Sequence, residues 1–466
     1  MGNRADIKTN SPRKQAGSLY LLNLGCAKNL VESEFLLWRL KKDGWKMTSV
    51  PAKAEVIIIN TCAFITPAIE ESIEEILLLA ENKKKGACKK LIVAGCLPQR
   101  FQKEISKSMP EADYFVGTGA FHKIPEIINI KKRNKNIFPD PNKSPFPKHN
   151  QKRIIQNKKS VYIKIAEGCN RKCSYCIIPE LKGKYRSRPF ADIISEAQAL
   201  IKKGAKEISL IAQETTLYGK DLKNAPDFSE LLKIISEKVF SYSKDITIRV
   251  LYTHPASLNK KIIKTVAQTK NIASYFDLPI QHASDKILKK MKRGYNAEKL
   301  YETINVIKNY DPNAVLRTSI IVGFPNETEK DFKLLYDFIK KVKFDHLGAF
   351  MYSDAEDIPS NKFKRRVSKE IAEKRYKTLM KKQAEISYNK NQKRIGKIYK
   401  VLIEKKEEKN IFTGRAWFQA PEVDGIVYVN AGNKISMDNK LKIEEGEIVS
   451  VKIEDAAEYD LFGTPI

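Results

Sequence analysis

The sequence predicts an α/β protein of three domains, and its 466 residues are enough for roughly that number. Two patterns carry this prediction. Over residues 18–130 and again over 160–394, apolar runs of strand length alternate with segments of helical spacing, which is typical of parallel sheets covered by helices. Over residues 397–466, turn residues separate short strands predicted at 397–404, 412–418, 425–429 and 447–453, which indicates a small antiparallel β-barrel.

The first domain, residues 18–130, is predicted to be a doubly wound parallel sheet. Thr66 and Pro67 are expected as the N-cap and first residue of its second helix. The apolar runs that indicate its strands are 18–24, 55–60 and 91–94, and the helices are expected at 29–43, from 66 to about 82, and from about 98.

One cysteine follows each of these three strands, at Cys26, Cys62 and Cys96. Because parallel strands bring their carboxyl ends to one edge, where ligands bind, we expect the three thiolates to converge into a metal site. The alternative is that they are unrelated small residues in loops. Cys88 lies in a Lys/Gly turn outside this pattern and is interpreted as a non-ligand.

Residues 131–159 are predicted to be a linker. Pro139, Pro141, Pro145 and Pro147 lie among Asn and Lys residues, and prolines at that density prevent a regular helix or strand.

The central domain, residues 160–394, contains six strand–helix units, too few to close an eight-stranded barrel. A long basic helix is expected at 368–394, leading into the last domain. The predicted strands are 161–166, 207–211, 246–251, 274–279, 315–321 and 346–351, and predicted helices include 190–203, 227–239, 296–309 and 328–341.

Polar residues are expected at the carboxyl-end rim of these strands, where catalytic groups of barrels lie. Each alone is more simply a structural residue, and the common location favours a site. They are Gln213, Glu214, His254, Gln281, His282, Arg317 and Thr318.

Three cysteines directly after the run 161–166 have the spacing Cys-x3-Cys-x2-Cys, at Cys169, Cys173 and Cys176. Thiolates are soft ligands that suit iron–sulfur clusters, and three of them leave the fourth iron of a cubane cluster open. The alternative is a zinc site, but zinc sites normally have four ligands and no fourth Cys or His follows nearby.

The net charge of +30 favours a polyanionic partner such as a ribosome or RNA, although Lys-rich faces that only maintain solubility are the alternative. The runs 289–293 and 364–366 are candidates for ribosomal RNA contact, with solvated helix faces as the alternative. Residues 397–466 hold ten Lys/Arg and thirteen Asp/Glu, a net −3 that suits a basic protein better than RNA.

Seven cysteines do not suggest a disulfide scaffold in a chain of this length. The polar start argues against a secretion signal, and apolar runs are too short for a membrane span. We therefore expect a cytoplasmic protein with no membrane partner.

The cysteine spacing, with Tyr175 before the last cysteine, resembles the signature of the radical S-adenosylmethionine (SAM) enzymes. The whole chain resembles the methylthiotransferases, which join an N-terminal cluster domain, a partial radical SAM barrel and a C-terminal TRAM barrel. The segments that carry this similarity are Leu24 to Glu34, Asn60 to Ile65, and Ile177-Ile178-Pro179 with Ser187-Arg188-Pro189.

One branch of that family modifies an adenosine in tRNA, and another an aspartate of ribosomal protein S-twelve. The chain is similar to the second branch in Gly25 to Leu30, with Ala27 in place of proline, in Leu278 to Ser284 with its Gln-His pair, and in Ala420 to Gly425. The acidic barrel agrees, because the target protein is basic.

The resemblance implies two 4Fe–4S clusters, one on Cys26, Cys62 and Cys96 and one on Cys169, Cys173 and Cys176. It also implies two uses of SAM, one for methyl transfer and one for a 5′-deoxyadenosyl radical that abstracts hydrogen from the aspartate β-carbon, and an electron donor such as a flavodoxin or a ferredoxin. The substrate that the resemblance implies is S-twelve, free or in the small ribosomal subunit.

Side chains for SAM and catalysis are inferred from the rim position and the signature. Tyr175, Gln213, Glu214 and Arg317 are predicted to contact SAM. No catalytic residue is assigned; Arg317 and His282 are candidates, and His282 is equally well explained as a buried structural histidine.

Two alternatives remain open at this point. The enzyme could be MiaB-like and modify tRNA, which tight, salt-dependent tRNA binding would favour. The chain could instead be an iron–sulfur ribosome-binding factor without turnover, which SAM cleavage would exclude.

Overall fold

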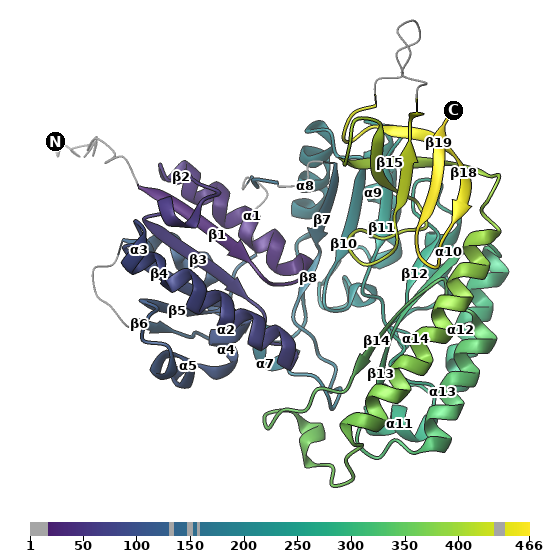
Figure 1. Cartoon of the computed structure of the whole chain (residues 1–466), viewed down its shortest axis with the longest axis horizontal. Helices are drawn as coiled ribbons and strands as arrows, with labels where there is room; N and C mark the ends of the chain where they lie inside the picture. The colour runs from purple at the N-terminus through teal and green to yellow at the C-terminus, as the bar shows by residue number, and fades with distance from the viewer. Residues whose placement is uncertain (1–16, 130–134, 147–151, 156–158, 433–442) are drawn as a thin grey trace, which may run out of the picture. The chain divides into compact units, whose positions relative to one another are not determined.

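The computed structural model describes residues 17–129, 135–146, 152–155, 159–432 and 443–466, and the chain divides into two compact units, Met1–Ile154 and Ile155–Ile466 (Figure 1). No helix within the described ranges is both long enough and apolar enough to cross a membrane.

The first unit contains a six-stranded sheet with the order β2-β1-β3-β4-β5-β6, in which every pairing is parallel. This confirms the predicted doubly wound sheet. Three of its strands carried no recognisable pattern, because β2 and β6 are only two and three residues long and β5 has four. The strands are β1 (Ser18–Asn23), β2 (Lys46–Met47), β3 (Val56–Thr61), β4 (Lys90–Gly95), β5 (Tyr114–Gly117) and β6 (Lys135–Ile137).

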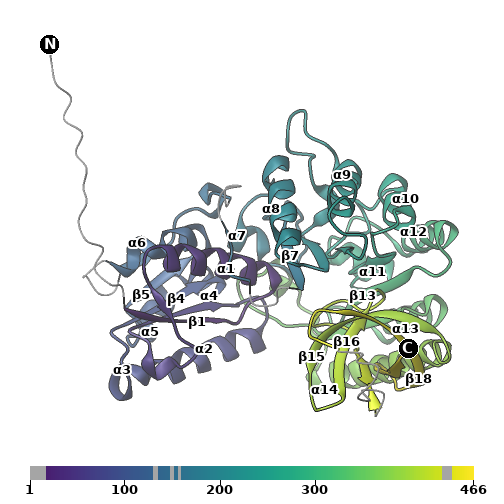
Figure 2. The same cartoon turned by 90° about the horizontal axis from the view of Figure 1, so that it is seen from above.

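Helices cover both faces of this sheet. One face packs against α1 and α6 around a core that includes Leu19, Leu36 and Ile58, and Figure 2 shows α2 on the opposite face. The second helix begins at Thr66 with Ile65 as its N-cap, so the predicted N-cap is wrong by one residue. The helices are α1 (Ala27–Lys42), α2 (Thr66–Ala80), α3 (Asn82–Lys85), α4 (Cys96–Phe101), α5 (Lys103–Ser108) and α6 (Ile124–Ile128), with 3-10 turns η1 (Pro51–Lys53) and η2 (Thr118–Lys123).

The predicted linker, residues 131–159, lies partly outside the described residues. Within its described parts, Lys135–Ile137 is the edge strand β6, and Pro141–Lys143 is a 3-10 turn, η3. The expectation that this segment contains no regular structure is therefore wrong for 135–137, because the prolines begin only after the strand has ended.

The second unit contains six parallel strands in the order β7-β10-β11-β12-β13-β14. They form two three-stranded sheets, which a parallel bridge between Ile248 and Ile272 joins. Neither β7 nor β14 pairs with the other, so the barrel described here is open. The strands are β7 (Ser160–Lys164), β10 (Glu207–Ile211), β11 (Thr247–Val250), β12 (Tyr275–Asp277), β13 (Val315–Val322) and β14 (His346–Met351).

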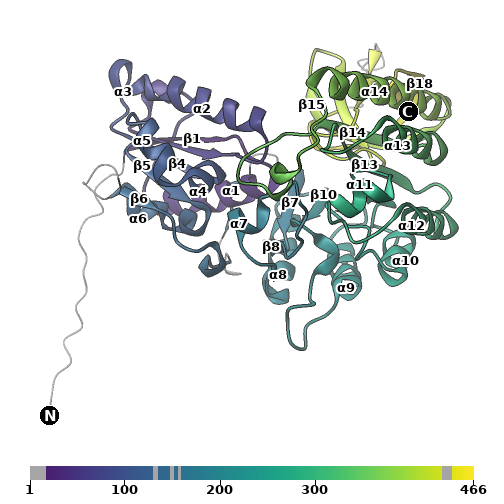
Figure 3. The same ribbon diagram turned by 90° about the horizontal axis from the view of Figure 1, so that it is seen from below.

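Helices lie along the outer side of this partial barrel (Figure 3). Two of them begin with capping boxes, Asp227 with Glu230 and Thr328 with Asp331, which satisfy backbone N–H groups of the first turn. The helices are α7 (Ile178–Lys182), α8 (Phe190–Lys202), α9 (Phe228–Phe240), α10 (Lys260–Gln268), α11 (Asp285–Lys290), α12 (Ala297–Tyr310), α13 (Glu329–Val342) and α14 (Lys369–Gln392), with 3-10 turns η4 (Thr215–Leu217) and η5 (Pro359–Lys362).

The chain ends in a closed five-stranded barrel with the order β15-β16-β17-β19-β18. The predicted barrel is confirmed, but its last strand was missed, and that strand pairs in parallel with β17. The strands are β15 (Ile398–Lys406), β16 (Ile411–Ala416), β17 (Val427–Asn430), β18 (Ile448–Ala456) and β19 (Leu461–Pro465).

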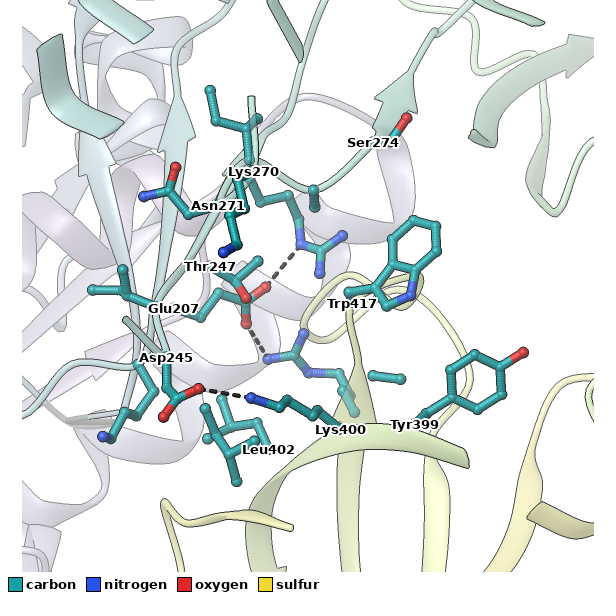
Figure 4. A pocket seen from close by; sticks show the side chains of 18 of the residues that line it. Glu207, Asp245, Thr247, Lys270, Asn271, Ser274, Tyr399, Lys400, Leu402 and Trp417 are labelled. Carbon is teal, nitrogen blue, oxygen red and sulfur yellow. Dashed lines mark hydrogen bonds and ion pairs between the residues drawn. The ribbon is translucent and has the colours of Figure 1, made fainter. Parts of the chain in front are cut away.

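Buried ion pairs join this closed barrel to the amino-terminal ends of the partial barrel's strands. Glu207 accepts hydrogen bonds from Arg249 Nε at 2.8 Å and from Arg415 Nη2 at 2.5 Å, and Figure 4 shows both interactions at its carboxylate. Burial alone would raise the pKa of Glu207, but the two arginines lower it to about 2. Beside this junction lies a cavity of about 530 Å³, bordered by Lys270 and Trp417 (Figure 4).

Candidate functional site

The loop with the three closely spaced cysteines follows the carboxyl end of β7. A short antiparallel pair, β8 (Ala166–Glu167) and β9 (Arg186–Ser187), closes the base of this loop. Gly168 has φ +77°, and a Cβ there would lie 2.2 Å from the carbonyl oxygen of Lys184, so only glycine fits. The N–H of Cys169 donates to the Gly183 carbonyl at 3.1 Å.

Each of the three sulfur atoms receives an N–H hydrogen bond. The backbone N–H groups of Arg171 and Ile178 donate to Cys169 Sγ at 3.3 Å and Cys176 Sγ at 3.5 Å. The third donor is a side chain, because Arg293 Nη1 lies 3.3 Å from Cys173 Sγ. Hydrogen bonds of this kind stabilise negative charge on sulfur.

The three thiols fit an iron–sulfur cluster. Burial, followed by the neighbouring thiolates, raises the pKa of Cys176 to about 12, and burial, Glu214 and Cys173 raise that of Cys169 to about 11. The thiols therefore lie close together and need a cationic centre to ionise at neutral pH. In the described part of the chain, no three Cys, His, Asp or Glu side chains surround a position for a single metal ion. Independently of that, thiolates are soft ligands that suit iron–sulfur clusters, in which each thiolate binds its own iron.

Glu214 fixes this loop to the end of β10. It is only 1% exposed, and its carboxylate accepts two hydrogen bonds from Arg171, from Nη2 at 2.7 Å and Nε at 2.8 Å. Ser257 also donates to it. The neighbouring Gln213 donates to Glu167 at 2.6 Å, while its own Oε1 has no partner among the described residues. Both predicted rim residues thus lie beside the cysteine loop.

Arg293 is a site residue that the sequence analysis missed. It was interpreted as part of a surface charge run, yet only 5% of it is exposed. Besides Cys173, its guanidinium donates to Tyr175 Oη at 3.0 Å, Tyr295 Oη at 2.8 Å and the Pro279 carbonyl at 2.7 Å. The signal that could have found it is weak, because one arginine among lysines looks like a solvated helix end.

His254 lies on the same side of the partial barrel, after β11. Its Nδ1 accepts the N–H of Ala256 at 3.2 Å, which places the ring proton on Nε2. Burial, together with the charges of Arg293 and Arg171, lowers the pKa of His254 far below its usual value. Its Nε2 has no hydrogen-bond partner among the residues that the structure describes, so it is a neutral donor available to a ligand.

Arg317 does not lie at the rim. It is the third of eight residues in β13, and its guanidinium contacts Asp277 Oδ1 at 3.0 Å and Asp424 Oδ1 at 3.4 Å. The rim position expected for it is wrong, because Arg317 is the third residue of the strand, five residues before the strand's carboxyl end at Val322. That Arg317 contacts SAM stays an untested prediction, and its two carboxylate partners argue against it.

His282 is fully buried. Its Nδ1 accepts the N–H of Ser284 at 2.9 Å, and its Nε2 lies 4.0 Å from Glu327 Oε1. Thr318 is also buried and donates to the Leu278 carbonyl. These contacts support the structural interpretation of His282 over a place in the substrate pocket.

The other three cysteines lie at one edge of the first unit's sheet. Register pairs Asn23 with Asn60 and Thr61 with Gly95, so Cys26, Cys62 and Cys96 follow neighbouring strand ends. Burial, and also the charge of Cys26, raises the pKa of the Cys62 thiol, which indicates that these two sulfur atoms are near each other.

The side chain of Asn60 forms several hydrogen bonds at this edge of the sheet. Its side chain donates to Ser33 Oγ at 3.0 Å, to the Asn29 carbonyl at 3.2 Å and to Asn23 Oδ1 at 3.3 Å. These bonds tie the loop that carries Cys26 to the end of β3. By contrast, Cys88 is buried near the start of β4, at the opposite end of the strands, so it is apart from this edge.

Three family models match successive parts of the chain. They are the radical SAM superfamily over residues 163–339, an uncharacterized protein family, UPF0004, over 18–117, and the TRAM domain over 395–466. The first includes the loop with Cys169, Cys173 and Cys176, and the second includes Cys26, Cys62 and Cys96.

Curated relatives match over nearly their whole length. A protein of Desulfosudis oleivorans is 45% identical over 96% of this chain and 99% of its own, and one of Clostridioides difficile is 46% identical over 95% and 97%. Both are named ribosomal protein uS12 methylthiotransferase RimO.

Among solved structures, the radical SAM methyltransferase TsrM of Kitasatospora setae, with cobalamin and a 4Fe–4S cluster bound, has a TM-score of 0.57 at 13% identity, covering 74% of each chain. At that identity the likeness concerns the fold alone. The full-length relatives decide the family: the chain belongs to the methylthiotransferases of the radical SAM superfamily, with the proteins named RimO.

Proposed function

We propose that this radical SAM methylthiotransferase adds a methylthio group to the β-carbon of an aspartate in ribosomal protein uS12, the S-twelve protein of the small subunit. The observation that carries the proposal is identity of 45% to a uS12 methylthiotransferase over 99% of that protein's length. Because the match covers nearly the whole of both proteins, it is not restricted to the residues that form the hydrophobic cores.

The radical SAM cluster is assigned to Cys169, Cys173 and Cys176. When bound, this cluster and SAM supply a 5′-deoxyadenosyl radical that can remove an unactivated hydrogen. The chain's own groups hold the loop: Arg171 pairs with Glu214, and N–H groups donate to all three sulfur atoms.

Contacts to SAM are assigned to the unsatisfied polar atoms beside this loop. Gln213 Oε1 offers an acceptor and His254 Nε2 a donor, and both are buried without partners among the described residues. Tyr175 packs against the core formed by Ile287, Met291 and Phe324, which supports a role in shaping the loop. Glu214 is already engaged by Arg171, so we assign it to positioning.

A second 4Fe–4S cluster is assigned to Cys26, Cys62 and Cys96 on the first unit. Their place after neighbouring parallel strands supports this assignment, as does the separation of Cys88 from them in the fold. The sulfur to be transferred would bind at this cluster.

Partners follow from the substrate. The C-terminal barrel, with its net −3 charge, is suited to dock the basic uS12 protein, and the strongly positive remainder is suited to touch ribosomal RNA. An electron donor such as a flavodoxin or a ferredoxin would reduce the radical SAM cluster. A ribosomal substrate also supports the proposal of a cytoplasmic location.

The test is an anaerobic competition. Reconstituted enzyme receives SAM, reductant and sulfide together with uS12 and unmodified tRNA, and mass spectrometry follows both. We expect a methylthio group on one aspartate of uS12. Its appearance on tRNA instead would overturn the substrate assignment, and the absence of SAM cleavage would overturn the enzyme assignment.

Two cysteine variants provide a matched comparison in the same assay. Cys176→Ala removes a predicted ligand and should lower bound iron by about half while abolishing SAM cleavage. Cys88→Ala changes another buried thiol that is predicted to bind nothing, and it should keep both iron and turnover. Equal iron content in the two variants would contradict the ligand assignment.

A further inference from the structure

Arg293 differs from the other buried arginines in its partners. Six arginines are buried in the part of the chain that the structure describes. Five contact a carboxylate: Arg153 with Glu34, Arg188 with Glu196, Arg249 and Arg415 with Glu207, and Arg375 with Glu327. Arg293 instead donates to the neutral oxygen atoms of Pro279, Tyr175 and Tyr295 and to Cys173 Sγ.

A buried guanidinium without an anion is costly, because the low-dielectric interior stabilises a charge only when it is paired. Cys173 Sγ, 3.3 Å from Arg293 Nη1, is the acceptor in this set that can become negative. The nearby Arg171 does not compete for this role, since its two hydrogen bonds to the Glu214 carboxylate already neutralise it.

We propose that Arg293 is the counter-charge of the radical SAM cluster and raises its reduction potential. This inference rests on the proposed cluster at Cys169, Cys173 and Cys176. A 4Fe–4S core with three thiolates carries one net negative charge when oxidised and two when reduced. A fixed cation beside it therefore stabilises the reduced form more.

The redox step itself is simple. One electron passes from an external one-electron reductant to the cluster, no covalent bond forms or breaks, and Arg293 keeps its protons throughout. Arg293 is thus a positioning and tuning residue and takes no part in the chemistry. The alternative is a purely mechanical role, because the same side chain ties the cysteine loop to the Pro279 carbonyl after β12.

The experiment measures the midpoint potential of this one cluster. The full-length chain carrying Cys26→Ala, Cys62→Ala and Cys96→Ala is reconstituted with iron and sulfide and titrated with dithionite, while electron paramagnetic resonance follows the reduced cluster. Arg293→Gln removes the charge, Arg293→Lys keeps it, and Tyr175→Phe removes one hydrogen bond but no charge. Iron content is determined for every variant.

With Arg293→Gln, we expect the ratio of reduced to oxidised cluster at a fixed potential to fall roughly tenfold or more, with Arg293→Lys and Tyr175→Phe close to the parent. Arg293→Gln could instead bind no iron while Arg293→Lys binds iron and has the midpoint potential of the parent. That result would also support the proposal, because it shows that the cluster requires a positive charge at this position. An unchanged potential in Arg293→Gln, an equal shift in both arginine variants, or loss of iron from both overturns the proposal. A parent that binds no cluster overturns the proposed function instead.

Discussion

His254 is held neutral by its surroundings, and this has a consequence for stability. In the folded chain, burial and the nearby Arg293 and Arg171 keep its pKa far below the usual 6.5, so it binds no proton at mildly acidic pH. In the unfolded chain the same imidazole is protonated below that value. The free energy of unfolding is therefore unaffected above pH 6.5 and decreases as the pH falls below it.

We expect His254 to cost about 2 kcal/mol of stability at about pH 5 relative to about pH 7.5, since each pKa unit corresponds to about 1.4 kcal/mol. The measurement is urea unfolding of the metal-free protein at both values of pH, for wild type and His254→Asn. The variant should lose less stability on acidification. An identical loss in the two proteins would show that the folded histidine takes up the proton.

Individual residues could be singled out as candidates from the sequence when their chemistry was specific. The six cysteines stood out because closely spaced thiols, and thiols that directly follow neighbouring parallel strands, are typical of cluster ligands. Arg293 and Arg317 could not be placed in the same way, because a guanidinium looks alike in sequence whether it borders a sulfur atom, pairs with a carboxylate or faces water. Their roles depend on partners such as Asp424, which lies 107 positions from Arg317.

At the level of elements, the strands of the partial barrel were the most reliable prediction. The runs at 207–211 and 346–351 match β10 and β14 residue for residue. The strand β19 was missed, since it carries polar, glycine and proline residues and is a strand only because β17 and β18 offer it partners. Pairing between distant segments is a tertiary effect that a local pattern does not contain.

The junction between the two barrels of the second unit depends on Glu207. Because its folded pKa of about 2 lies below the unfolded value of 4.5, its contribution to stability is fully present above pH 4.5 and is lost as the pH falls through 2. Glu207→Gln leaves Arg249 and Arg415 buried without this carboxylate, and we expect it to destabilise the unit by about 3–5 kcal/mol.

Asp245→Asn is the matched control for that substitution. Asp245 forms an exposed ion pair with Lys400 at 2.8 Å across the same junction, and exposed pairs contribute at most about 1 kcal/mol. Unfolding can be followed by the fluorescence of Trp417, with Trp38 and Trp45 replaced by Phe. Similar effects of the two substitutions would contradict the central place given to Glu207.

At the level of the whole molecule, the structural division differs from the division of the sequence into three domains. The first unit has its own sheet and core, whereas the C-terminal barrel shares buried charges with the partial barrel. Composition distinguished the acidic barrel, but it could not reveal that Arg415 and Asp424 have their partners on other strands.

We therefore expect the two ends of the chain to respond differently to truncation. Residues 17–155 should fold alone and unfold cooperatively on heating. Residues 1–394 should aggregate or melt well below the full chain, because Glu207 and Arg317 lose partners. Size-exclusion chromatography and circular dichroism measure both. A monomeric 1–394 fragment with the melting temperature of the full chain would contradict this expectation.

The ion pairs of Arg415 with Glu207 and of Asp424 with Arg317 also limit how the protein can be recombined. Half of each pair lies in each barrel, so the C-terminal barrel is not an interchangeable module. A chimera that takes its last barrel from another protein needs an arginine and an aspartate at the matching places. Without them, Glu207 and Arg317 of the partial barrel would remain buried without these ion-pair partners.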